Sequence, residues 1–169
     1  FSFTQLQTTF GVIMLAIVDG EPKMLNLRQI LEEYVKFQMD VITRRTRFDL
    51  KKAQERAHIL EGLMIALDFI DEVIAILRAA KSIPEGKTAL MERFGLDDVQ
   101  AQAIVQMRLG QLTGLEREKI EEELAGLKEK IADFLDILAS EGRRLAIVKD
   151  EAQAMKKKFG DERRTEIAA

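Results

Sequence analysis

Residues 120–138 read IEEELAGLKEKIADFLDIL. Their apolar residues recur at alternating steps of four and three, which is the a/d pattern of a coiled coil. The spacing continues toward the C-terminus after one missing apolar position at Glu141. The full series is Ile120, Leu124, Leu127, Ile131, Phe134, Leu138, Leu145, Val148, Ala152, Met155 and Phe159. This pattern predicts a long helix whose apolar seam faces a partner helix.

A second series of the same kind lies in the first half of the chain. It consists of Leu27, Ile30, Tyr34, Phe37, Val41 and Phe48, and it resumes in a shifted phase at Ala53, Ala57, Leu60, Met64 and Leu67. Each series covers about 40 residues, or about 60 Å of helix at about 1.5 Å per residue. Two runs of equal length predict one antiparallel helical hairpin with a small domain at its tip.

The missing apolar position at Ser140–Gly142 is expected to lie opposite Thr43–Arg47, where the first series changes phase. Serine and glycine weaken a helix by up to about 1 kcal/mol each relative to alanine. One interpretation is a flexible joint at this level of the hairpin. The other is an ordinary stutter in a rigid coiled coil.

Composition agrees with a chain that is mostly helix. Charged residues make up 33% and apolar residues 47%, tryptophan is absent, and there are two prolines. The net charge of −3 gives no bulk electrostatic reason to expect binding to nucleic acid or to an anionic membrane. The absence of cysteine excludes disulfides and thiolate metal sites, and it is compatible with a reducing cytosol.

No secretory signal is visible, and the most apolar run, Val12–Val18, is far shorter than the about 20 residues of a membrane-spanning helix. The chain begins without a methionine, so we expect it to be part of a longer protein. Val12–Val18 is rich in β-branched residues and predicts a strand. Asp19-Gly20 can then form a tight turn, with Lys23–Leu25 returning as a second strand. Such a hairpin should pack on the base of the first helical arm or on other parts of the protein.

Helix caps divide the chain further. Asn26 with Gln29 and Thr113 with Glu116 have capping-box spacing, and Asp97 is a third N-cap. The expected organisation is residues 1–26 as an N-terminal segment with the hairpin, 27–67 as the first arm, 68–119 as a helical tip, 120–160 as the second arm and 161–169 as a linker. A bend is expected between Leu67 and Asp71. Ser82 and Pro84 should open a short helix that Gly95 ends.

The predicted tip helix at 98–111 is apolar on nearly all sides, with only glutamines and Gly110 forming a polar strip. A helix of this kind requires burial on several sides. A second copy of the tip could complete that burial by twofold symmetry. The alternative is that the neighbouring short helices of the same tip suffice.

Residue types that carry chemistry are few. His58 is the only histidine and falls inside the first arm, where an interhelical or solvent-side position is expected. Tyr34 falls in the seam and is read as a packed aromatic residue. Glu121–Glu123 complement the helix dipole near the start of the second arm. We expect no catalytic residue, no metal site and no bound cofactor in this chain.

One cluster of positive charge stands out, formed by Arg44, Arg45, Arg47 and Lys51, with Lys52 and Arg56 nearby. Under the hairpin pairing, Asp133, Asp136 and Glu141 lie opposite, so interhelical ion pairs are the first reading. A weak surface for contacting DNA phosphates is the second, and it would show salt-dependent duplex binding.

Several longer segments resemble the A subunits of bacterial type IIA DNA topoisomerases, those of DNA gyrase or, as the alternative, of topoisomerase IV. They are VITRRT (41–46), AHILEG (57–62), AQAI (101–104), MRL (107–109), LTGLE (112–116) and FGDERRTEI (159–167). The resemblance covers essentially the whole chain. It implies the end of the tower domain, the coiled-coil arms, and a terminal globule that dimerises as the exit gate, or C-gate, for transported DNA.

By that likeness, the gate region contains Met91, Phe94, Ile104, Met107, Leu109 and Leu112. The family's catalytic tyrosine lies in an Ala-Ala-x-Arg-Tyr-Thr type of motif, which Tyr34 does not match, so this chain alone should neither cleave DNA nor hydrolyse ATP. The resemblance further implies a homodimer, a partner in the gyrase B subunit, duplex DNA in transit, ATP and Mg²⁺ in the holoenzyme only, no membrane, and a bacterial cytoplasmic location. Two rivals remain: a helical arm that binds nucleic acid, and a purely structural coiled-coil spacer.

Overall fold

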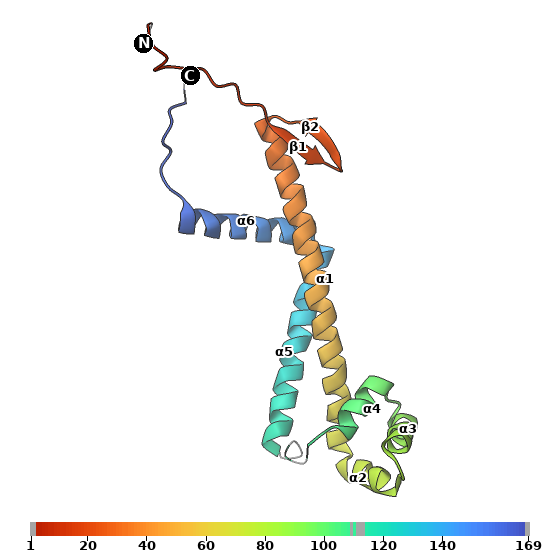
Figure 1. The fold of residues 1–169 in the computed structure, drawn as a ribbon. Helices are drawn as coiled ribbons and strands as arrows, with labels where there is room; N and C mark the ends of the chain where they lie inside the picture. Colours follow the sequence, from red (N-terminus) through yellow and green to blue (C-terminus); the bar gives the residue numbers. More distant parts are fainter. Residues whose placement is uncertain (1–2, 109, 111–113, 168–169) are drawn as a thin grey trace. The chain divides into compact units, whose positions relative to one another are not determined.

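The computed structural model describes residues 3–108, 110 and 114–167 and is mainly helical, as the sequence predicts (Figure 1). The elements in chain order are β1 (Leu15–Val18), β2 (Glu21–Met24), α1 (Leu27–Asp68), α2 (Ile70–Ala79), α3 (Ile83–Phe94), α4 (Asp98–Val105), α5 (Gly114–Ala139) and α6 (Glu141–Phe159). None of the described helices combines the length and apolar composition needed to cross a bilayer.

The chain divides into two compact units. The terminal unit consists of residues 1–43 and 144–169, and the central unit of residues 44–143. The helix α1 contributes to both, because its 42 residues run without interruption from one unit into the other.

In the terminal unit, β1 and β2 form the predicted hairpin. Leu15 pairs with Met24 and Val18 with Glu21, around a turn in which Asp19 and Gly20 have φ angles of 54° and 83°. The strand expected from Val12 begins only at Leu15, and Val12 is exposed. A groove lined by residues of both elements, Ile17, Val18, Asp19, Glu33, Lys36 and Phe37, places the hairpin against the first turns of α1.

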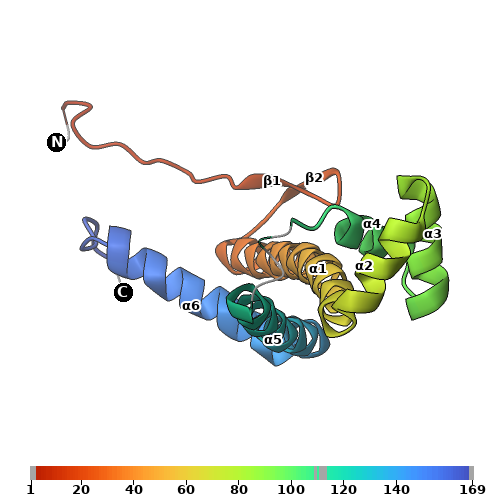
Figure 2. The same cartoon turned by 90° about the horizontal axis from the view of Figure 1, so that it is seen from below.

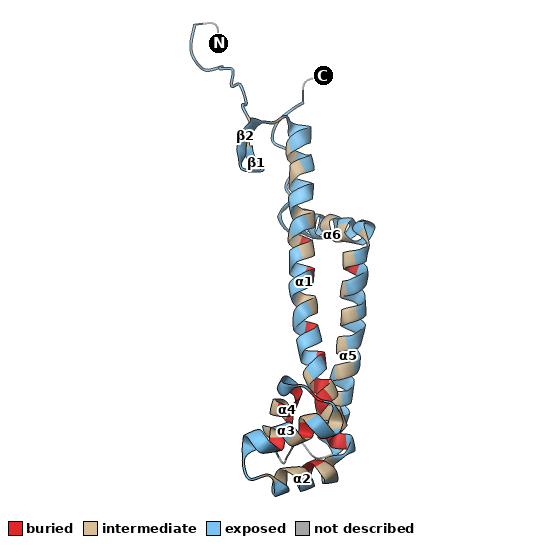
Figure 3. Cartoon of the chain, turned by 90° about the vertical axis from the view of Figure 1, so that its right-hand side faces the viewer, coloured by how far each residue is buried: buried red, intermediate tan, exposed pale blue. Residues whose placement is uncertain are grey.

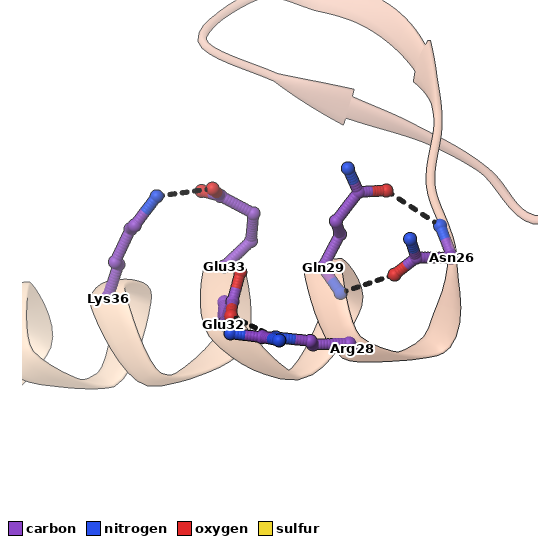
Figure 4. A network of polar contacts seen from close by, with 6 residues as sticks. All are labelled: Asn26, Arg28, Gln29, Glu32, Glu33 and Lys36. Atoms are coloured by element: carbon purple, nitrogen blue, oxygen red, sulfur yellow. Dashed lines mark hydrogen bonds and ion pairs between the residues drawn. The ribbon is translucent and has the colours of Figure 1, made fainter.

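The start of α1 carries the predicted capping box (Figure 4). The Asn26 Oδ1 accepts a hydrogen bond from the Gln29 backbone N–H over 2.9 Å, and the Gln29 Oε1 accepts one from the Asn26 N–H over 2.9 Å. Arg28 and Glu32 then form an ion pair one turn apart. Because side chains satisfy the backbone N–H groups of Asn26 and Gln29, the helix begins at Leu27.

The buried face of α1 agrees with the second predicted series, whose Ala53, Ala57, Leu60 and Leu67 are buried, and departs from the first series. Thr46, Ala53, Leu60 and Leu67 are buried at intervals of seven, so one heptad phase runs through residues 46–67. Phe48 is 61% exposed, and the predicted seam residues Tyr34 and Phe37 are exposed as well. The a/d assignment was wrong in this part of the helix because the buried residue, Thr46, is polar. The nearby aromatic residues are apolar and fit the a/d spacing, although they are exposed.

Within the central unit, α5 runs beside this part of α1 (Figure 3). Its predicted seam residues are half-buried along its length, and Ile137 is buried. Ion pairs join the two helices, among them Arg56 with Glu123, Glu61 with Lys128, and Asp68 with Arg117.

The second arm is two helices rather than one, because α5 ends at Ala139 and α6 begins at Glu141. Ser140 lies between them, and its Oγ accepts a hydrogen bond from the Arg143 backbone N–H over 3.3 Å, as an N-cap does. The break coincides with the missing apolar position in the sequence pattern. In α6 the predicted seam residues Met155 and Phe159 are exposed.

The tip is formed by α2, α3 and α4, which gather beside the end of α1 (Figure 2). The expected bend occurs at Phe69, between α1 and α2. Ser82 caps α3 by accepting from the Glu85 N–H, and Gly95 ends it with φ 67°. The tip core consists of Ala66, Val73, Leu90, Leu96 and Ile104.

The helix predicted at 98–111 ends at Val105 instead. The backbone N–H of Gln106 still bonds to Gln102 O, but the N–H of Met107 bonds to Ile104 O in a tighter turn. Apolar periodicity continues beyond this turn, so it could not mark where the helix stops. Thr113, the predicted cap of the second arm, lies outside the described residues.

Candidate functional site: the helical tip and its attachment to the arm

The tip core uses several residues that sequence reasoning assigned to a dimer interface. Ile104 is 3% exposed and belongs to the core, and Phe94 and Met107 are partly buried against it. Met91 is half-buried on α3. Leu109 and Leu112 lie outside the described residues. Within one chain, Ile104 therefore has almost no surface to offer a second copy, and the neighbouring short helices cover much of α4.

Other apolar side chains of the tip are exposed. Ile83 is 65% exposed at the start of α3, Val99 53% at the start of α4, and Phe69 53% between α1 and α2. Ile83 also borders a groove lined by Leu77, Ala80, Lys81, Ser82, Ile83 and Val105. Sequence reasoning missed Ile83 and Val99. Their place in the first turn of each helix, one or two residues after an N-cap, was the available signal.

A polar cluster attaches the tip to α1. We call it the polar clamp: His58 on α1, with Asp97 and Gln100 at the start of α4. The His58 Nε2 lies 2.6 Å from the Asp97 Oδ2. The Gln100 Nε2 donates a hydrogen bond to the His58 carbonyl oxygen over 2.8 Å. Gln100 is buried, so this bond fixes α4 against the α1 backbone.

Asp97 has a second task in the polar clamp, because it also caps α4. Its Oδ1 accepts from the Gln100 backbone N–H over 2.8 Å, and the Gln100 Oε1 accepts from the Asp97 N–H over 3.3 Å. The Gln100 N–H, followed by the His58 side chain, holds the pKa of the Asp97 carboxyl below its usual range. The carboxylate is therefore ionised throughout the neutral range, whereas His58 forms an ion pair only when its imidazole is protonated.

Sequence reasoning placed His58 at an interhelical or solvent-side position, and it is interhelical. It did not link His58 to Asp97, which is 39 residues away. The sequence predicted Asp97 as an N-cap but could not reveal which residue lies across from it.

The ion pairs between α1 and α5 are all about half exposed. Arg56 binds Glu123 with two hydrogen bonds, Nε to Oε1 at 2.7 Å and Nη2 to Oε2 at 2.9 Å. This contact lowers the pKa of the Glu123 carboxyl. The two-pronged geometry is the strong form of an arginine–carboxylate contact, although both side chains remain about half exposed.

The residues of the predicted basic cluster make contacts of different kinds. Lys51 lies 3.8 Å from Glu55 one turn away, and Arg44 and Arg45 both take part in polar or charged contacts. Arg47 is exposed. The expected acidic partners Asp133 and Asp136 both bind Arg143, at the start of α6.

Tyr34 lies in the terminal unit, in a groove lined by Tyr34, Gln38, Val148, Glu151, Ala152 and Met155. Among the described residues, no group of three or more histidine, cysteine, aspartate or glutamate side chains could hold a metal ion. What these residues can do together is pack helices and hold them in register.

Comparison with known proteins agrees with the sequence segments named above. A family model for the A subunit of DNA gyrase/topoisomerase IV matches residues 1–153. The chain belongs to this family. It is 57% identical to the DNA gyrase A subunit of Clostridium acetobutylicum over 167 residues, and 56% identical to that of Streptococcus pneumoniae over the same length. It is 52% identical to the DNA gyrase A subunit of Halalkalibacterium halodurans over 166 residues.

These alignments cover 98–99% of the chain but 20% of each relative. The chain therefore spans about a fifth of the length of the gyrase A subunits that it matches. Within the family of DNA gyrase/topoisomerase IV A subunits, it corresponds to one segment of the larger protein.

Proposed function

We propose that this chain is the arm and exit-gate segment of a type IIA topoisomerase A subunit, and that two copies join through their tips. The observation that carries the proposal is the tip itself: a small helical core that leaves Ile83, Val99 and Phe69 exposed. Exposed apolar side chains grouped on one small globule favour association with a protein surface. Twofold pairing is the commonest arrangement for identical subunits.

The role of the segment in this proposal is mechanical. A gate must hold two protomers together while a duplex passes and must then let them part. A modest apolar contact suits that task better than a large obligate interface. The sequence proposes gate residues that would support this contact from the side facing the tip core: Met91, Phe94 and Met107. Leu109 and Leu112 are further candidates.

The reaction itself belongs to the whole enzyme in this proposal. ATP-dependent supercoiling, the bond-breaking tyrosine, Mg²⁺ and the gyrase B subunit lie outside the segment, and duplex DNA passes it in transit. We place the enzyme in the bacterial cytoplasm. The same segment of a topoisomerase IV A subunit is the alternative, since the family model covers both enzymes.

Sedimentation of the 169-residue chain tests the proposal. We expect a concentration-dependent dimer at micromolar protein, and at least tenfold weaker association for Ile83→Glu and Val99→Glu. Leu135→Glu is the matched control, because Leu135 is an exposed leucine of α5 away from the tip. Circular dichroism checks that each variant remains helical. A wild-type monomer at high micromolar concentration would contradict the gate assignment.

A further inference from the structure

We propose that the outer edge of β1 is the pairing site for a further β-strand, supplied by the part of the A subunit that lies outside this chain. Such a strand would turn the two-stranded hairpin into part of a larger sheet. The pairing requires only that the chain belongs to a longer A subunit, and it is independent of whether the tips form a gate. Support comes from the backbone of β1, the composition of β2 and the burial of the terminal unit.

The hydrogen-bond pattern of the hairpin determines which backbone groups of β1 are free. The Met14 O accepts a hydrogen bond from the Leu25 N–H over 2.9 Å, so these two residues form a bonded pair. Bonded and non-bonded pairs alternate along an antiparallel ladder, which places Leu15 and Ile17 at non-bonded positions. Their N–H and C=O groups therefore point away from β2. No further strand pairs with β1 among the described residues (Figure 1).

The two edges of the hairpin differ in their ability to accept a strand. In β2 the outward positions are those of Pro22 and Met24. Proline has no N–H to donate, and within sheets it is found on edges, at first residues or at bulges. β2 also contains Glu21 and Lys23, and charged residues of this kind protect a sheet edge from pairing. β1 has the sequence Leu-Ala-Ile-Val, which includes none of these residue types, so its edge is the one open to a partner strand.

One face of the hairpin is apolar and uncovered. Directly paired residues of two strands point to the same face of a sheet, so Leu15, Ile17, Pro22 and Met24 share a face. Leu15, Ile17 and Met24 are 67%, 78% and 75% exposed. A strand paired with β1 would extend this apolar face. Because a two-stranded hairpin is only marginally stable in water and a sheet of three or more strands can be stable, the added strand would also stabilise the hairpin.

The terminal unit indicates where the partner strand comes from. Among the described residues of this unit, 3–43 and 144–167, only Ile42 is buried, so this part of the chain has no core of its own. The chain covers 20% of the length of its gyrase A relatives, which leaves most of such a subunit to complete the unit. A strand of the same polypeptide is present at high effective concentration. Pairing within one subunit also removes an exposed edge that would otherwise promote aggregation.

Residue-resolved hydrogen exchange of the full-length A subunit, without the B subunit, tests the pairing. The amides of Leu15, Ile17 and Met24 all point outward, so the hairpin by itself protects none of them. After correction for intrinsic rates, Leu15 and Ile17 should exchange about tenfold more slowly than Met24, or slower still. Equal exchange of the three amides would overturn the proposal. So would protection that is lost on dilution, which would indicate a second copy, or protection that requires added B subunit.

Proline substitutions in the full-length subunit give a second readout. Ile17→Pro removes an N–H that a partner strand needs and that β2 does not use, so the Leu15 amide should lose its protection. Ile17→Ala removes most of the side chain but keeps the N–H, and it should retain that protection. Met24→Pro is the matched control on the opposite edge, and it should leave the Leu15 amide protected.

Protection of α3 amides in every variant checks that the subunit remains folded. With α3 protected, an Ile17→Pro variant that keeps the slow exchange of Leu15 would contradict pairing at the β1 edge. Loss of that slow exchange in Met24→Pro as well would show that the two edges do not differ, and it would also count against the proposal.

Discussion

Gly62 on α1 lies against Gln100 on α4 with no space for a side chain between them. A Cβ added to Gly62 would lie 2.7 Å from the Gln100 Cβ and 2.8 Å from its Cγ. The Cβ is fixed to the α4 backbone, so it cannot move aside without moving the helix. The two helices can approach this closely because residue 62 is glycine.

We predict that Gly62→Ala destabilises the chain although alanine is the better helix former. Alanine favours a helix by about 1 kcal/mol over glycine. Overpacking a tight contact costs about 1–3 kcal/mol, which outweighs that gain at this position. The expected net loss is about 1 kcal/mol, measured as the free energy of unfolding in urea.

Gly126→Ala provides the matched comparison. Gly126 is an interior residue of α5, and a Cβ there would meet no atom within 4 Å. Without a clash, only the helix preference remains, so this variant should gain up to about 1 kcal/mol. Stabilisation of similar size by both substitutions would refute the close contact at Gln100.

Acid should weaken the arm through Glu123. Because Arg56 lowers the pKa of Glu123 in the folded chain, their contact contributes stability above the unfolded pKa of about 4.3. That contribution is lost as the pH falls through the lower, folded pKa. Both side chains are about half exposed, so solvent screening limits the contribution to about 0.2–1 kcal/mol.

Urea unfolding from pH 7 to pH 2.5 measures this effect. Glu123→Gln should be less stable than wild type at pH 7 and equal to it at the acid end, where the carboxyl is protonated in both states. Glu122→Gln is the control, because no ion pair of Glu122 is found among the described residues. If the free energies of unfolding of Glu123→Gln and wild type differed by the same amount across the pH range, the loss of stability would not come from the charge of Glu123.

Local signals in the sequence proved the most reliable guide to this fold. The capping box of Asn26 and Gln29, the cap at Asp97 and the left-handed Gly95 were all predicted, because each depends on residues within one helical turn. The bend at Phe69 followed from a restart of the apolar pattern. Such features depend little on the rest of the chain.

Longer-range features were harder to predict. The buried seam passes through Thr46, which no apolar pattern includes, while the exposed Phe48 fitted the pattern well. The polar clamp joins His58 to Asp97 across 39 residues, and the spacing of neither residue indicates the other. Ile104 was read as interface because apolar periodicity shows that a residue is buried but not which surface buries it.

The basic cluster on α1 offers a test of DNA binding. If Arg47 and Lys51 touch phosphates of a duplex, replacing both with alanine should weaken binding. It should also reduce the slope of log affinity against log salt by about 0.9 for each phosphate that is no longer neutralised. Fluorescence anisotropy with a short duplex at several salt concentrations measures this slope. Lys130 is an exposed lysine of α5, and Lys130→Ala should leave this slope unchanged. Duplex binding that does not vary with salt would argue against phosphate binding.

The break at Ser140 predicts a joint between α5 and α6. Amides of residues 140–143 should exchange faster than those around Leu127, because the helix is interrupted and two residues there, Ser140 and Gly142, favour helix poorly. Gly142→Ala should stiffen the joint: its Cβ would lie 3.8 Å from the Ser140 Oγ, an ordinary contact, and the gain in helix preference is about 1 kcal/mol. That gain corresponds to roughly fivefold slower local exchange. Wild-type protection at Ser140 equal to that at Leu127 would favour the rigid stutter.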